Sequence, residues 1–196
     1  MEYATALKNV MTYEEYRSLT EQLVIQRDTT GNDKDTSRIE YTALNEQRMR
    51  RLDKTIKILE SERIAINETI NEPQEWILIT ESWCGDAAHA APVISKLAQA
   101  SNLITLRLVL RDENPELMDQ FLTNGSRSIP MLIMASHTGE IIGRWGPRPS
   151  IATKMVKDYK SVHGVVDAPI KEELQRWYNK NKGRNIIADI LSVLNS

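Results

Sequence analysis

The feature that most constrains the fold is a short apolar run followed directly by the start of a helix. Trp76-Ile77-Leu78-Ile79-Thr80 is apolar almost throughout, which is typical of a strand buried on both faces. Residues 86–100 then have a helical pattern, which is expected to end near Asn102. A buried strand that leads into a helix predicts an α/β fold, with a central sheet flanked by helices.

The elements that follow this unit predict a mixed sheet. Residues 103–110 alternate between apolar and polar side chains, as a second strand does. Asn114-Pro115 is a helix start, and the helix is expected to end at Asn124-Gly125. Residues 131–136 and 140–145 then predict two short strands joined as a hairpin. Parallel strands joined by helices therefore precede an antiparallel pair.

Helical segments flank this sheet and divide the chain into three parts. Residues 1–70 form a helical N-terminal extension, and residues 71–163 form the α/β domain. Residues 164–196 form a C-terminal helical tail packed on the same domain, interrupted near Lys182-Gly183.

The N-terminal extension is expected to contain two helices. The first begins at a capping box made by Thr12 and Glu15, and the second runs from about Ser37 to Glu60. The second helix carries one apolar stripe, formed by Met49, Leu52, Ile56 and Leu59. This stripe either covers the sheet or pairs two copies of the chain, so the protein is expected to be a monomer or a homodimer.

Composition excludes several classes of partner. The chain has 196 residues and a formal net charge of −2, which gives no reason to expect nucleic acid or an anionic membrane as a partner. Its apolar runs are far shorter than the roughly 20 residues of a membrane span, and no secretory signal is recognisable. A cytoplasmic location is therefore expected, and the presence of one cysteine agrees with it.

The single cysteine, Cys84, follows the buried strand directly and lies at the predicted start of the helix of residues 86–100. A helix N-terminus favours negative charge and lowers the pKa of a thiol, whereas the nearby carboxylate of Asp86 raises it. The sequence leaves open which effect is larger. A metal site made by Cys84, Asp86 and His89 is not expected, because their spacing differs from that of known zinc motifs.

The residues around Cys84 resemble the active-site motif of the thioredoxin superfamily. Trp83-Cys84-Gly85 matches the first three positions, Pro92 matches the helical proline, and Ser128-Ile129-Pro130 is similar to the loop that carries a cis proline. The resemblance covers about residues 74–163. The Trp-Cys-Gly-Asp form is similar to a bacterial thioredoxin-like subgroup with no established activity. Asp86 and Ala87 depart from the motif, since Ala87 stands where the resolving cysteine is found.

The resemblance implies roles for the motif residues. Cys84 would be the exposed attacking sulfur and the catalytic residue, and Pro130 would lie beside it after a cis bond. The backbone of Ile129 would pair with an extended partner segment. The binding surface would include Trp83, with Gly85 and Asp86 next to it.

Two functions from different classes follow. The first is monothiol thiol–disulfide exchange, or thiol redox sensing, through Cys84. Since Ala87 is no cysteine, a thiol–disulfide oxidoreductase of this kind needs an external low-molecular-weight thiol, with no bound cofactor. Its partner would be a protein or a small-molecule thiol or disulfide. The alternative is a redox-inactive protein-binding module that uses the groove between Trp83 and Pro130.

Overall fold

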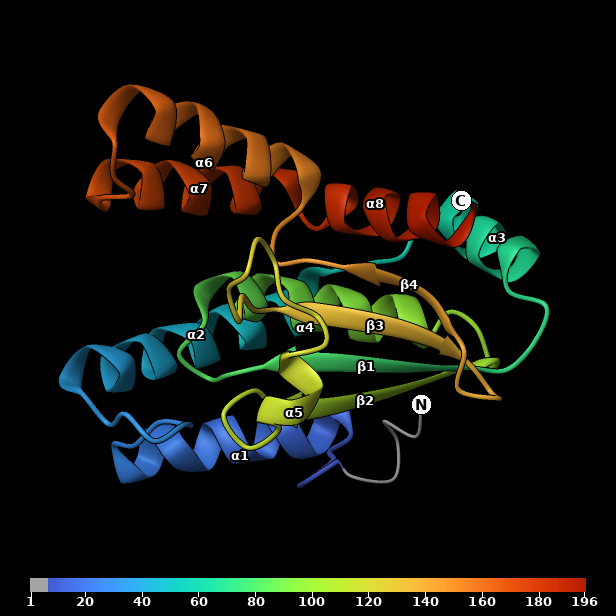
Figure 1. Ribbon diagram of the computed structural model, residues 1–196, viewed down its shortest axis with the longest axis horizontal. Helices are drawn as coiled ribbons and strands as arrows, with labels where there is room; N and C mark the ends of the chain where they lie inside the picture. The colour runs from blue at the N-terminus through green and yellow to red at the C-terminus, as the bar shows by residue number, and fades with distance from the viewer. Residues whose placement is uncertain (1–6) are drawn as a thin grey trace.

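The computed structural model describes residues 7–196 and contains a mixed four-stranded sheet in the order β2-β1-β3-β4 (Figure 1). The strands are β1 (Gln74–Thr80), β2 (Ile104–Leu110), β3 (Met131–Ser136) and β4 (Ile141–Trp145). β1 pairs with β2 in parallel, whereas the β1–β3 and β3–β4 pairs are antiparallel. The predicted α/β fold class and the final hairpin are therefore confirmed.

Eight helices accompany the sheet in the described part of the chain. They are α1 (Tyr13–Gln26), α2 (Thr36–Thr55), α3 (Glu60–Thr69), α4 (Gly85–Ala98), α5 (Pro115–Met118), α6 (Ser150–His163), α7 (Ala168–Asn181) and α8 (Arg184–Leu194). The first begins at the predicted capping box, with Thr12 and Glu15 each accepting the other's backbone N–H. Within residues 7–196, no helix has the length and apolar character needed to cross a membrane.

Alternate side chains of the sheet enter two separate apolar clusters. Trp76 and Leu78 on β1 face a cluster that includes residues of α1, α2, α3, α4 and α8. Ile77 and Ile79 face the opposite cluster, which includes α5 residues and Cys84. Residues 76–80 of β1 are fully buried, because the strand is central and each face is covered.

The predicted second helix is in fact two helices. α2 ends at Thr55, and Ile56 takes an extended conformation before α3 begins at Glu60. The break is held from outside the segment, since Arg184 of α8 binds the Glu62 carboxylate at 2.6 Å and also donates to the Lys57 carbonyl. A tertiary contact of this kind leaves no sign in the local apolar periodicity.

The apolar stripe of the N-terminal extension packs into the protein's own core. Met49, Leu52 and Ile56 are buried together with Tyr16 of α1. Leu59, the fourth member, is 52% exposed because the helix has ended before it. α2 thus lies directly against α4, the helix that begins at Cys84.

The helix predicted from Asn114-Pro115 to Asn124-Gly125 is much shorter than expected. α5 ends at Met118, and the Asn114 side chain makes no N-cap bond. Instead it donates hydrogen bonds to the carbonyls of Lys8 and Leu110. Asn124 and Gly125 both have positive φ and form a separate turn. The side chain that was expected to start the helix therefore fixes the N-terminal segment to β2.

The C-terminal helices divide into a docked part and a projecting pair. α8 packs on α4 and β4, whereas α6 and α7 pack on one another around Ala152, Ile170 and Leu174. In Figure 1 this pair projects at the upper left, beyond the ends of the strands. The predicted interruption occurs at Lys182 and Gly183, which both have positive φ. α6 and α7 thus lie toward the same end of the sheet as the start of α4.

Candidate functional site

Cys84 is the residue immediately before α4, but its sulfur is not exposed as the resemblance implied. The side chain is 8% exposed and packs in the cluster on the α5 side of the sheet. Its Sγ donates a hydrogen bond to the carbonyl of Ile129 at 3.4 Å. The expectation that this sulfur is exposed is therefore wrong, because Ile129 in the loop before β3 packs against it.

The environment of Cys84 favours the neutral thiol. The pKa of the Cys84 thiol is raised to about 12, mainly by burial and to a smaller extent by the neighbouring Asp86 carboxylate. The backbone N–H groups of Ala87 and Asp86 act in the opposite direction, since they stabilise a thiolate. The sequence left open whether the helix N-terminus or Asp86 has the larger effect on this pKa. Burial has a larger effect than either, and it depends on the tertiary structure.

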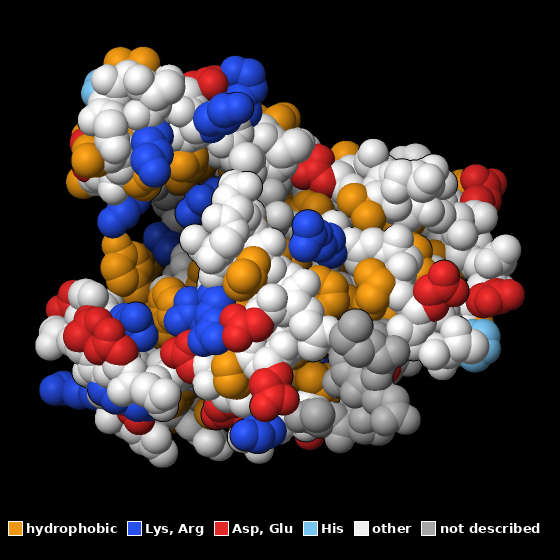
Figure 2. Space-filling model, viewed as in Figure 1, with side chains coloured by type: hydrophobic (Ala, Val, Ile, Leu, Met, Phe, Trp, Pro, Cys, Tyr) orange, Lys and Arg blue, Asp and Glu red, His pale blue; other side chains and the backbone are white. Residues whose placement is uncertain are grey.

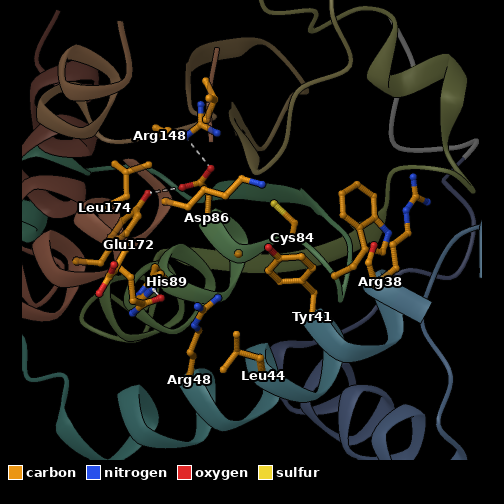
Figure 3. Close-up of a pocket in the computed structure, with 17 residues that line it drawn as sticks. Arg38, Tyr41, Leu44, Arg48, Cys84, Asp86, His89, Arg148, Glu172 and Leu174 are labelled. Atoms are coloured by element: carbon orange, nitrogen blue, oxygen red, sulfur yellow. Dashed lines mark hydrogen bonds and ion pairs between the residues drawn. The ribbon is translucent and has the colours of Figure 1, made fainter. Parts of the chain in front are cut away.

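Asp86 connects three separate parts of the chain. Its carboxylate forms an ion pair with the Arg148 guanidinium at 2.7 Å and accepts a hydrogen bond from the Tyr178 hydroxyl at 2.8 Å. Burial raises the pKa of Asp86, against the lowering effects of Arg148 and Tyr178. The first turn of α4 is therefore fixed to α7 and to the segment that follows β4 (Figure 3).

His89 is a packing residue one turn further along α4. Its ring stacks on Tyr178 with the ring centroids 4.2 Å apart, and Nε2 lies 3.2 Å from the Gln175 amide oxygen. Burial lowers the pKa of His89 to about 4, so the ring is neutral at neutral pH. His89 thus strengthens the contact between α4 and α7.

Trp83 lies between two arginines at the edge of the site. The guanidinium carbons of Arg38 and Arg111 lie 4.5 Å and 4.9 Å from its ring centroid. Arg38 comes from α2, so the N-terminal extension contacts the motif directly. The indole Nε1 is buried and has no hydrogen-bond partner among the described residues.

The peptide bond between Ile129 and Pro130 is cis, as the resemblance implied. Both residues are buried, and their backbone lies against the motif through the bond from Cys84. Gly146 packs against them from the other side, because a Cβ at this position would lie 2.2 Å from the Pro130 carbonyl oxygen. The structure thus brings Ile129 and Pro130 to Cys84 but leaves them outside the lining of the neighbouring pocket.

A pocket of about 620 Å³ lies beside Cys84, between α2, the start of α4 and α7. Figure 2 shows it as a hollow below the lobe formed by α6 and α7, with basic side chains around its opening. Trp83, Cys84, Gly85 and Asp86 all line it. Four of the predicted site residues therefore share one cavity.

Sequence reasoning missed the other walls of this pocket. α2 supplies Arg38, Tyr41, Leu44 and Arg48, which are spaced three, three and four residues apart. That spacing is a second stripe on the helix, beside the apolar one, and it is a signal that could have been found. α7 contributes Lys171, Leu174 and Tyr178, which are spaced three and four residues apart and so also form a stripe on one helix. The sequence does not show that this stripe faces Cys84.

Comparisons with known proteins agree with this architecture. A crystal structure of a protein of unknown function from Pseudomonas aeruginosa superposes with a TM-score of 0.60 at 15% identity, covering 78% of this chain and 85% of that one. A crystal structure of an HIV epitope scaffold gives a TM-score of 0.55 at 15% identity, covering 94% of this chain and 98% of that one. At these identities the likeness concerns the fold alone. No curated protein matches the chain.

The family match covers more of the chain than the residues around Cys84. The thioredoxin family model matches residues 31–160. The match therefore includes α2 and α3 as well as the sheet, Cys84 and the cis proline. It covers well over half of the sequence, and the chain belongs to the thioredoxin family.

Proposed function

We propose that this protein is a redox-inactive, ligand-binding member of the thioredoxin family, and that its ligand occupies the pocket beside Cys84. One observation carries the proposal: a buried, hydrogen-bonded thiol forms part of the wall of a cavity of about 620 Å³. Cavities of roughly 300–1,000 Å³ are typical of small-molecule sites. The partner that fits is therefore a small molecule.

The chemistry of Cys84 supports binding over exchange. Thiol–disulfide exchange requires a thiolate, and burial keeps this thiol protonated at neutral pH. Ala87 occupies the position of a resolving cysteine, and the sequence contains no other cysteine. Cys84 then acts as a small apolar surface of the pocket.

Monothiol exchange with an external low-molecular-weight thiol is the second candidate. The observation that favours it is the pair of N–H groups of Asp86 and Ala87, which stabilise a thiolate at Cys84. In this case an external disulfide would exchange with Cys84, and one thiolate would leave as the mixed disulfide forms. Mass spectrometry after incubation with glutathione disulfide distinguishes the two candidates, since a stable adduct on Cys84 supports exchange.

Pocket binding is tested with N-phenyl-1-naphthylamine, an uncharged aromatic dye that becomes fluorescent in apolar sites. We expect saturable binding to the wild-type protein and a dissociation constant at least about tenfold higher for Leu44→Trp, because the larger side chain fills the cavity. Cys84→Ala should retain binding, since the thiol forms no bond to the ligand.

The matched control is Ile25→Trp, which adds the same indole to α1 at a residue 82% exposed and outside the pocket. This variant should bind the dye like the wild-type protein. Equal binding by the Leu44 and Ile25 variants, or no saturable binding by the wild-type protein, would contradict the proposal.

A further inference from the structure

The pocket beside Cys84 contains more positive than negative charge. Its cationic residues are Arg38, Arg48, Arg148 and Lys171, and its acidic residues are Asp86 and Glu172. Two of the cations already have carboxylate partners. Arg38 lies 3.3 Å from Asp33, and Arg148 pairs with Asp86.

Arg48 has no such partner. It is half-buried on α2, and its Nη1 donates to the neutral side-chain oxygen of Asn45 at 2.9 Å. Within residues 7–196, no carboxylate oxygen lies within 4.0 Å of its guanidinium, Asp86 included. A cation that has lost part of its hydration without gaining a counter-ion is unfavourable, and an anion bound beside it would relieve this.

The position of Arg48 indicates where that anion would lie. A Cβ built on Gly85 would be 3.4 Å from Nη1 of Arg48, so the guanidinium lies close to the first residue of α4. The dipole of α4 adds partial positive charge at the same place. Figure 3 shows Arg48 reaching from α2 toward α4, next to Leu44 and His89.

Between Arg38 and Arg48, the pocket wall on α2 also contains apolar side chains. Tyr41 and Leu44 are each 42% exposed and line the cavity, and Leu174 of α7 also lines it. Exposed apolar side chains beside an unpaired guanidinium match a ligand with one charged group and an apolar body.

We propose that the pocket binds a small organic anion, whose carboxylate or phosphate pairs with Arg48 while its aliphatic or aromatic body lies against Tyr41 and Leu44. This proposal rests on the proposed function and adds the chemical class of the ligand. Lys171 on α7 has no carboxylate within 4.0 Å among the described residues, and it adds positive charge to the same cavity.

The test compares two aromatic dyes that differ in charge. These are 8-anilinonaphthalene-1-sulfonate, which carries a sulfonate, and the uncharged N-phenyl-1-naphthylamine. Arg48→Met keeps the unbranched stem of the side chain but removes the charged guanidinium, so the dissociation constant of the anionic dye should rise by about tenfold or more. The constant of the uncharged dye should change by less than about twofold.

The matched control is Lys54→Met, which removes the same charge from an exposed residue of α2 outside the pocket. It should bind both dyes like the wild-type protein. Equal weakening by the Arg48 and Lys54 variants, or no weakening by Arg48→Met, overturns the anion assignment. If the uncharged dye still binds in that case, the proposed pocket function stands. If neither dye binds the wild-type protein, both proposals fail.

Competition identifies the charged group. Phenylacetate and phenyl phosphate are each added to the wild-type protein with the anionic dye bound. Displacement by phenylacetate supports a carboxylate ligand, and displacement by phenyl phosphate supports a phosphate ligand. Displacement by neither compound, or equal displacement by uncharged benzyl alcohol, overturns the anion assignment.

Discussion

Replacing Asp86 with alanine should lower the free energy of unfolding by about 3 kcal/mol. The substitution removes the counter-ion of Arg148 and the hydrogen-bond acceptor of the Tyr178 hydroxyl at once. Both partners are partly or fully buried, so the unmet polar groups are costly, although the partial exposure of Arg148 limits the loss. Urea unfolding measures the change.

Two variants control this result. Asp158→Ala removes an exposed carboxylate from its pair with Lys154 on α6 and should cost less than about 0.5 kcal/mol. Asp86→Asn retains an acceptor for Tyr178, so its loss of unfolding free energy should lie between those of Asp86→Ala and Asp158→Ala. If Asp86→Ala were no more destabilising than Asp158→Ala, Asp86 would not hold α7 in place.

Replacing Gly146 with alanine should destabilise the protein by about 4 kcal/mol, through backbone strain and steric overlap together. Gly146 has a φ of +129°, which an L side chain rarely adopts. The added Cβ would also lie 2.2 Å from the carbonyl oxygen of Pro130, which is backbone and has little freedom to move. Thermal and urea unfolding both measure this loss.

Gly125→Ala separates the two causes. Gly125 also has a positive φ, +75°, but a Cβ there would have no neighbour within 4 Å. This variant should cost only about 1 kcal/mol, which is the conformational part alone. Equal losses for the two glycines would show that the contact between Gly146 and Pro130 does not matter.

The elements predicted best from the sequence are those with strong local signals. The β1–α4 unit, the hairpin of β3 and β4 and the capping box of α1 follow from apolar patterning and capping residues. The end of α2 was mispredicted because Arg184, far along the chain, stabilises the break before α3. The length of α5 was mispredicted because Asn114 bonds to Lys8 and Leu110 rather than capping the helix.

Prediction of the site from the sequence was limited in the same way, by contacts between distant parts of the chain. The motif identified Trp83, Cys84 and Asp86, because their order along the chain is local information. Whether Cys84 is exposed depends on the packing of the loop before Pro130, which no local pattern reveals. The contribution of α7 depends on Tyr178 reaching Asp86 across ninety-two positions of sequence.

The measurement that tests the central claim most directly is the ionisation of Cys84. The ultraviolet absorbance of the thiolate is followed against pH, and the spectrum of Cys84→Ala is subtracted to remove the tyrosines. Because the chain contains one cysteine, the difference reports this sulfur alone. Burial predicts a neutral thiol from about pH 6 to about pH 10, with ionisation only above that range. A midpoint at or below the ordinary thiol value of about 8.5 would contradict the assignment of Cys84 as a neutral wall of a binding pocket.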